Sequence, residues 1–373
     1  VYTNLLQLDL AVDRAQRARA LARETGDDRS LAMAMDALQV ASVMIGDMAT
    51  VGVVSPTLVE IHRQRGDLWY LQSALFQWAW VDMAAGRWDA TEQRFAEGLA
   101  VNHQIGDRGN EPIFPATMSW VARARGHYGR AIELGRGALD LATEVGHAEF
   151  MSWAAGHLGW TLHEVFAIDE AVEHLERSVE AAEGAGARIE LVRAACHLPW
   201  VRWLAGDHPR ALEEASAAER LLREMTAPPG RAYLQGADGP IALANLHLAA
   251  ADPTRALELV GPVMEAAIDA EWHEVVAAAA LVAGRSSLRL GGVARARMVL
   301  EKALDRAERF DMPGLAWRAH AELAAVGPLD ERRIHDVRAR ELVDALSRSI
   351  EVESMRRTFL QGATAQLSGG GVG

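Results

Sequence analysis

The sequence of 373 residues predicts an all-α fold, namely a superhelical solenoid of about seven or eight helical hairpins over residues 1–327. Between regularly placed turns, segments such as "EQRFAEGLAV" and "ALDLATEV" carry apolar residues at helical spacing, without the alternation of a strand. A fixed period of this kind is typical of repeat architectures. One column of glycines has a period of forty residues and consists of Gly26, Gly66, Gly106, Gly146 and Gly186. A second column with the same period consists of Gly46, Gly86, Gly126, Phe166 and Gly206.

Each period is expected to hold two helices, which we call helix A and helix B, joined by turns that contain these glycines. Glycine suits such turns because it readily adopts the left-handed backbone conformation that ends a helix. A column of alanines keeps the same step, and small residues there allow two helices to approach closely. This column consists of Ala131, Ala171 and Ala211 and, after a five-residue insertion, of Ala256 and Ala296.

The insertion falls within "MTAPPGRAYLQGADGP", residues 225–240, where prolines and glycines predict a long loop. Two interpretations remain for this loop. It is either a surface insertion that the fold tolerates, or a lid or hinge beside a binding groove.

The C-terminal segment breaks the period. Residues 328–366 are expected to form an amphipathic helix and a shorter second helix, which cap the open end of the stack as terminal repeats must. Residues 367–373, "LSGGGVG", are expected to be a disordered tail. Because the chain also begins at Val1 without a methionine, we expect a fragment or a processed product.

Composition and charge exclude several classes of function. Half of the residues are apolar and 24% are charged, as in an ordinary folded protein. A net charge of −13 argues against direct binding of nucleic acid, which needs clustered cations. No apolar run is long enough to span a membrane and no signal peptide is recognised, so a cytoplasmic location is expected. With Cys196 as the only cysteine, neither an internal disulfide nor a cysteine-based zinc cluster is possible.

Motifs for catalysis are absent from the sequence. "HEVFA" and "HEVVA" match the zinc-protease pattern at two positions only, with Ala167 and Ala277 where the second histidine belongs. The single lysine, Lys302, lies in no phosphate-binding loop. We therefore predict no enzymatic activity, no cofactor and no metal. One enzymatic alternative stays open, namely an enzyme that uses His157 or His163 as general base. Neither histidine has a nucleophile or a fixed carboxylate at a recognisable spacing.

Tryptophan occupies one position of helix A in four consecutive repeats. When the repeats are aligned on their turns, this position, which we call the tryptophan column, reads Val40, Trp80, Trp120, Trp160, Trp200, Asn245 and Arg285. The indoles either pack in the core between neighbouring A helices or form an exposed aromatic stripe, which would imply a partner. Pro199, and Pro115 ahead of Trp120, are expected to kink helix A and so re-aim the indoles.

The repeat resembles a known family. Its turn and second helix, "GHYGRAIELGRGAL" with Gly126, Tyr128, Ala131 and Ala138, resemble tetratricopeptide repeats, although that unit has 34 residues. The longer repeat, with "ETGD", "RQRGD" and "HQIGD" closing helix B, is similar to the sensor domains of bacterial signal-transduction ATPases. These include maltose-activator-like and LuxR-type regulators and ATPase-coupled adenylate cyclases.

The resemblance implies that the tryptophan column faces a concave groove. Neighbouring groove positions then carry histidine, arginine and further aromatic residues, which suit a sugar, a flat apolar metabolite or a peptide. The predicted binding groove consists of Phe76, Trp80, Met83, Trp120, Arg123, Trp153, His157, Trp160, His163, His197, Trp200 and Trp203.

Two functions follow from this prediction. The first is a sensor module of a larger signalling or transcriptional regulator, in which a small molecule or peptide in the groove controls an attached or partner ATPase or output domain. The second is a scaffold that binds a peptide or protein and has no small-molecule ligand. Self-association into a homo-oligomer is compatible with either function.

Overall fold

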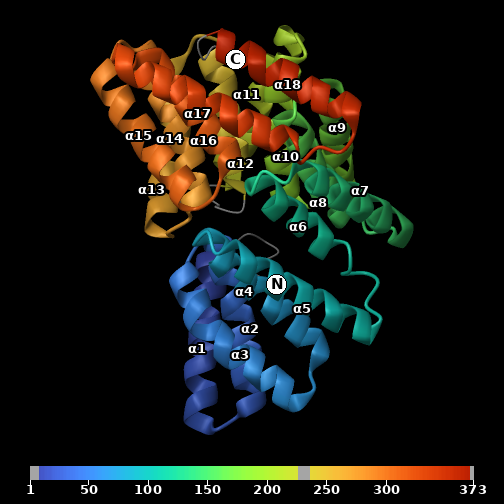
Figure 1. The fold of residues 1–373 in the computed structure, drawn as a ribbon. Helices are drawn as coiled ribbons and strands as arrows, with labels where there is room; N and C mark the ends of the chain where they lie inside the picture. The colour runs from blue at the N-terminus through green and yellow to red at the C-terminus, as the bar shows by residue number, and fades with distance from the viewer. Residues whose placement is uncertain (1–7, 226–235, 370–373) are drawn as a thin grey trace.

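The structure, a computed structural model, describes residues 8–225 and 236–369, which form 18 α-helices (Figure 1). The even-numbered helices α2 to α16 are the predicted A helices, and the odd-numbered helices α1 to α15 are the B helices. The all-α repeat fold is therefore confirmed. The helices are α1 (Leu8–Thr25), α2 (Asp28–Ile45), α3 (Met48–Arg65), α4 (Leu68–Ala84), α5 (Trp88–Ile105), α6 (Ile113–Ala124), α7 (Tyr128–Val145), α8 (Ala148–Glu164), α9 (Ile168–Ala185), α10 (Arg188–Leu204), α11 (His208–Met225), α12 (Asp238–Ala249), α13 (Pro253–Asp269), α14 (His273–Arg289), α15 (Val293–Arg309), α16 (Pro313–Val326), α17 (Leu329–Ser347) and α18 (Glu353–Ser368).

A left-handed residue ends most of the helices, as the glycine columns predict. Gly26 after α1 has φ 67°, and the carboxylate of the next residue, Asp27, accepts hydrogen bonds from the first backbone N–H groups of α2. The "GD" dipeptide thus stops one helix and starts the next.

The left-handed position persists where glycine is missing. Phe166 takes the glycine place with φ 62°, and after the insertion Ala251 (φ 64°) and Gly291 (φ 80°) continue the column forty residues apart. Glu271 and Asp311 repeat the same conformation at the other turn. Residues with a Cβ disfavour this conformation. The repeat geometry therefore imposes it on the four non-glycine residues against their own preference.

Replacing Ala251 with glycine is expected to raise the free energy of unfolding by about 1 kcal/mol. The substitution removes a left-handed penalty of roughly 1–2 kcal/mol and adds the entropic cost of ordering glycine, which is smaller. Ala251 is exposed, so little packing is lost. Thermal and urea denaturation measure the change. Gly291→Ala, at the equivalent turn with open space around it, should change stability in the opposite direction.

The predicted alanine column is buried within the stack of helices. All five of its residues are fully buried, with exposed fractions of 0%. A larger side chain at any of them would push neighbouring helices apart. The close packing of A and B helices is therefore a direct consequence of the repeat pattern.

The two expected proline kinks have different outcomes. Pro115 is the third residue of α6, within the first turn, where backbone N–H groups have no intrahelical acceptor in any case. The expectation that Pro115 kinks a helix is therefore wrong, because the helix begins only two residues before it. Pro199 does lie inside a helix, and α10 continues through it to Leu204.

The stack curls until distant repeats touch. In Figure 1 the chain runs from α1–α5 through α6–α11 and then back, so that α14 and α16 come near α6. Trp88 Nε1 donates to the carbonyl oxygen of Phe310 at 2.6 Å, and the rings of Trp80 and Trp272 are 5.8 Å apart. The inner face of the solenoid is consequently closed by the chain itself.

The C-terminal helices do more than cap the stack. The connection between α17 and α18 lies on the first turn of α7, where the backbone N–H groups of Tyr128 and Gly129 donate to Ser349 Oγ and to the Ser349 carbonyl oxygen, each at 3.1 Å. From there α18 returns to the middle of the chain, and Phe359 packs on Tyr128 and Phe166. The expectation of helices that only cap the open end is therefore incomplete.

The expected C-terminal tail and the expected long loop both lie partly outside the described residues. Residues 367 and 368 belong to α18 instead of a disordered tail, and residues 370–373 lie outside the described residues. Most of the expected loop, residues 226–235, also lies outside them. Among the described helices, none is long and apolar enough to cross a membrane.

Candidate functional site

Most of the tryptophan column lines one cavity, which is partly open to solvent. We call it the central cavity; its volume is about 420 Å³, and A helices α6 to α16 line it together with α18. Five consecutive members of the column contribute to its wall, one from each of α6, α8, α10, α12 and α14. These residues are Trp120, Trp160, Trp200, Asn245 and Arg285.

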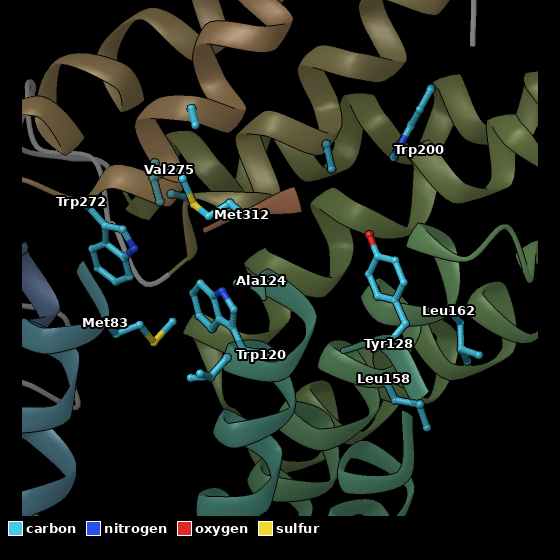
Figure 2. Packing of buried hydrophobic residues seen from close by; sticks show 14 of the residues in the cluster. Met83, Trp120, Ala124, Tyr128, Leu158, Leu162, Trp200, Trp272, Val275 and Met312 are labelled. Carbon is cyan, nitrogen blue, oxygen red and sulfur yellow. The ribbon is translucent and has the colours of Figure 1, made fainter. Parts of the chain in front are cut away.

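The indoles form part of the core as well as part of the cavity wall. The exposed fractions of Trp80, Trp120 and Trp200 are 0%, 2% and 5%, so the column is no exposed stripe. Trp120 packs edge-on against Trp80, with ring centroids 5.6 Å apart, and stacks on Trp272 at 6.2 Å. Figure 2 shows Trp120 and Trp272 facing one another beside Met83. The helices of the returning half cover the rings, so the indoles are part of the core, and those of Trp120, Trp160 and Trp200 also line the cavity.

The central cavity gathers half of the predicted groove residues. The predicted residues in its wall are Trp120, Arg123, Trp160, His163, His197 and Trp200. The predicted residues that are buried elsewhere are Phe76, Trp80, Met83, Trp153 and His157. Trp203 is half-buried and stacks on His208, with ring centroids 4.1 Å apart. A role of any of them in binding stays a prediction.

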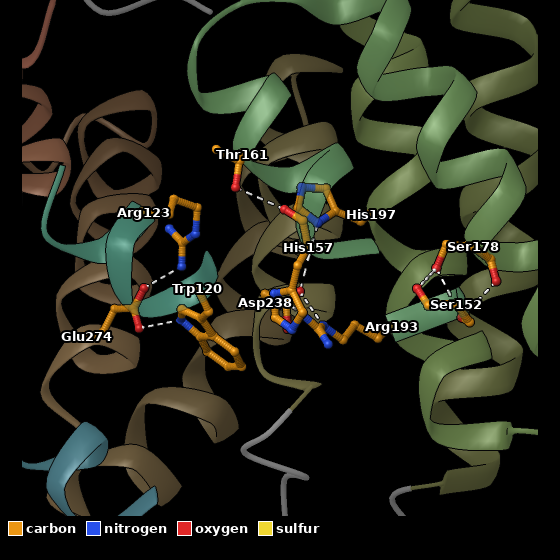
Figure 3. A network of polar contacts seen from close by, with 10 residues as sticks. All are labelled: Trp120, Arg123, Ser152, His157, Thr161, Ser178, Arg193, His197, Asp238 and Glu274. Carbon is orange, nitrogen blue, oxygen red and sulfur yellow. Dashed lines mark hydrogen bonds and ion pairs between the residues drawn. The ribbon is translucent and has the colours of Figure 1, made fainter. Parts of the chain in front are cut away.

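A buried ion pair joins the two halves of the solenoid at this cavity. Arg123 of α6 donates from Nη2 to Glu274 Oε1 of α14 at 2.6 Å, and Trp120 Nε1 donates to Glu274 Oε2 at 2.8 Å (Figure 3). The Arg123 guanidinium also lies over the ring of Trp160, 3.7 Å from its centroid. One carboxylate therefore orients an arginine and an indole that lie about 150 residues away in the chain.

A second polar cluster holds α8, α10 and α12 together. Arg193 Nε donates to Asp238 Oδ2 at 2.9 Å, and its Nη2 lies 2.8 Å from His157 Nε2 (Figure 3). Burial raises the pKa of Asp238, but Arg193 and His197 outweigh it, so the net pKa is lowered and the carboxylate is ionised. Burial and the neighbouring Arg193 hold the pKa of His157 well below its usual value.

Glu164 and Arg318 form a third pair in the cavity wall, at 2.8 Å. Burial raises the pKa of Glu164, but Arg318 more than compensates and lowers it overall. His163, which precedes Glu164 in the chain, lines the same cavity. The cavity surrounds the C-terminal end of α8 closely enough to include both residues.

His163 is neutral and has a defined tautomer. Trp200 Nε1 donates to His163 Nε2 at 3.1 Å, so the proton of the imidazole is on Nδ1. Burial lowers the pKa of His163 to about 3, and the nearby cations Arg318 and Arg123 contribute. Within the described residues no nucleophile is hydrogen-bonded to it, and no group of three histidine, cysteine or acidic residues there could hold a metal ion.

Acidification is expected to destabilise the protein through His163 and His157. The folded-state pKa of His163 is about 3 and the usual value is 6.5, so between these values the unfolded chain binds a proton that the folded protein does not. The free energy of unfolding then falls as the pH drops below 6.5, by on the order of 1 kcal/mol per pH unit for each such histidine.

Urea denaturation between pH 7 and pH 5 tests this expectation. His163→Gln keeps an acceptor for Trp200 but cannot bind the proton, so its stability should depend less steeply on pH. The same slope in His163→Gln and in the unchanged protein would contradict the assignment.

Sequence reasoning missed the charged partners of the cavity. Asp238 and Arg318 stand at the repeat position of Trp153, seven residues before the tryptophan column, so the alignment could have pointed to them. Their partners, and that of Glu274, come from other hairpins. Arg285 could have been found, because it stands in the tryptophan column. Its pairing with Glu322 could not, since it depends on how α14 and α16 are oriented.

The fold and cavity define an all-α solenoid of the tetratricopeptide-repeat-like class. No model of a known protein family and no curated protein matches the chain. Among solved structures, a Rap protein complexed with competence and sporulation factor is similar over 94% of this chain and 100% of its own, at 13% identity and a TM-score of 0.55. A signal-transduction ATPase with a tetratricopeptide-repeat sensor, from Pyrococcus horikoshii, matches 94% of this chain and 55% of its own, at 10% identity and a TM-score of 0.46. At such identities the Rap similarity establishes the fold alone.

Proposed function

We propose that this protein is a regulatory binding module in which the central cavity takes a small molecule or a short peptide. The observation that supports this most is the convergence of five residues of one sequence column on a single cavity of about 420 Å³. That volume falls within the range of about 300–1,000 Å³ typical of small-molecule sites, which combine apolar walls with a few polar groups. Three indoles and several paired charges provide that combination here.

Regulation follows from where the cavity lies. Its wall includes two ion pairs that join the outgoing and the returning halves of the solenoid, Arg123 with Glu274 and Arg318 with Glu164. A ligand that binds the closed arrangement better than a looser one would shift the equilibrium by the difference in affinity. An attached or partner ATPase or output domain would then sense the change. The Rap protein of similar fold, complexed with competence and sporulation factor, supports a ligand-binding role for this architecture.

A thermal-shift screen with amino acids, aromatic carboxylates, nucleosides and short peptides tests the proposal. A ligand at about one hundred times its Kd raises the free energy of unfolding by about 2.7 kcal/mol, which is visible as a higher Tm. Ala278→Phe fills part of the cavity from α14 and should abolish the shift. Ala20→Phe on the exposed side of α1 is the matched control and should preserve it.

Two results would contradict the proposal. A compound that stabilises the unchanged protein and the Ala278→Phe variant equally binds outside the central cavity. If no member of the panel raises the Tm while a protein partner binds both variants with the same affinity, the protein is a scaffold whose interface lies elsewhere.

A further inference from the structure

We propose that Arg285 anchors a carboxylate of the ligand, and that the apolar body of the ligand lies against the indoles of Trp160 and Trp200. This inference rests on the proposed function, since it assumes that the central cavity is the binding site. It adds the chemical class of the ligand, an apolar or aromatic carboxylate. The carboxylate belongs either to a small metabolite or to the C-terminus of a short peptide.

Arg285 has donors that the described part of the chain leaves unused. It lies in α14, lines the central cavity and is 8% exposed. Its Nε donates to Glu322 Oε1 at 2.6 Å, but neither terminal nitrogen donates to a described residue, and Nη2 is fully buried without a partner. Buried guanidinium donors without acceptors are costly, so they favour a ligand that supplies the acceptors.

The shape of these donors suits a carboxylate. Nη1 can donate to one carboxylate oxygen, and a ligand that turns the guanidinium toward the cavity would bring the buried Nη2 to the second oxygen, which gives two parallel charge-assisted hydrogen bonds. A phosphate dianion fits less well, because three acidic residues also line the cavity: Glu164, Asp238 and Glu274.

The acidic residues do not exclude a monoanion, because each of them is already paired with an arginine. Glu164 binds Arg318, Asp238 binds Arg193 and Glu274 binds Arg123, at 2.6–2.9 Å.

The rest of the wall determines the body of the ligand. Trp160 is half-buried and Trp200 is 5% exposed, and both line the cavity together with aliphatic side chains from α12, α14 and α16. Arg123 covers one face of Trp160, which fixes the ring. A flat apolar group therefore has a rigid surface to pack against, and Arg285 provides the position for its charge.

Matched pairs of probes test the inference by isothermal titration. One pair is 3-phenylpropionate and 3-phenylpropionamide, and the other is the tripeptide Gly-Leu-Phe with a free or an amidated C-terminus. We expect each carboxylate to bind at least about tenfold more tightly than its amide, as for a charged hydrogen-bonded pair. The pair with the higher affinity identifies the source of the carboxylate.

Arg285→Lys keeps the charge and the partner Glu322 but loses the two-nitrogen fork, so the preference for the carboxylate should disappear. The control, Arg202→Lys, changes a buried and ion-paired arginine away from the cavity and should keep the preference. If Arg285→Lys does not fold, the double variant Arg285→Gln, Glu322→Gln removes both charges together and serves the same purpose.

Equal binding of acids and amides, or a preference that survives in the Arg285 variant, would overturn the inference. Neutral probes that bind and are excluded by Ala278→Phe would still support the proposed function in that case. If none of the four probes binds, the inference fails as well, and the thermal-shift screen decides separately whether the cavity is a ligand site.

Discussion

Replacing Glu274 with leucine is expected to lower the free energy of unfolding by roughly 3–5 kcal/mol, as when one partner of a buried ion pair is removed. The Arg123 guanidinium is 7% exposed and would lose its carboxylate, and Trp120 Nε1 would lose its acceptor. The substitution also loosens the contact between the two halves of the solenoid. Urea denaturation followed by far-ultraviolet circular dichroism measures the loss.

The double variant Arg123→Met, Glu274→Leu separates the cost of an unpaired charge from the value of the pair. Removing both charges leaves no buried ion, so much of the lost stability should return. If the double variant is less stable than Glu274→Leu alone, the arginine stabilises the fold mainly through its contact with Trp160. That result would contradict the explanation by an unpaired charge.

Gly129→Ala is expected to displace the C-terminal helices and to cost roughly 2–4 kcal/mol, from overpacking and from weakened hydrogen bonds. A Cβ at this position would lie 2.3 Å from the carbonyl oxygen of Ser349, a backbone atom that cannot rotate away. The same carbonyl accepts the hydrogen bond from the Gly129 backbone N–H. Since α18 lines the central cavity through Gly362 and Gln366, its release would also open that cavity.

Hydrogen exchange and limited proteolysis of α18 check this second expectation. Gly137→Ala is the matched control in the same helix, because nothing lies within 4 Å of a Cβ placed there. It should leave α18 protected and should raise stability slightly, by about 0.5–1 kcal/mol for alanine in a helix interior. Unchanged protection of α18 in Gly129→Ala would show that Ser349 does not hold the segment in place.

Local features of the fold could be predicted from the sequence because each repeat carries them itself. The forty-residue period marks where helices end, and the buried alanine column marks where they touch. Phe166 and Ala251 adopt the left-handed conformation at these turns because the repeat geometry imposes it and not because of their own preference.

The site was predictable only in part. Aligning the repeats identified the tryptophan column, whose members from Trp120 to Arg285 reach one cavity. It could not identify which indoles the returning helices would cover, nor the acidic partners Glu164 and Glu274, which depend on contacts between hairpins that are far apart in the chain.

The sequence by itself determined the class of fold, the turns and the column in which the tryptophans recur, because these properties repeat within forty residues and depend on local spacing. Only the tertiary structure decided that the inner face closes into a cavity. Closure depends on small rotations between successive hairpins that add up along the solenoid, until Arg123 meets Glu274 and Ser349 meets the start of α7. No local pattern encodes that sum.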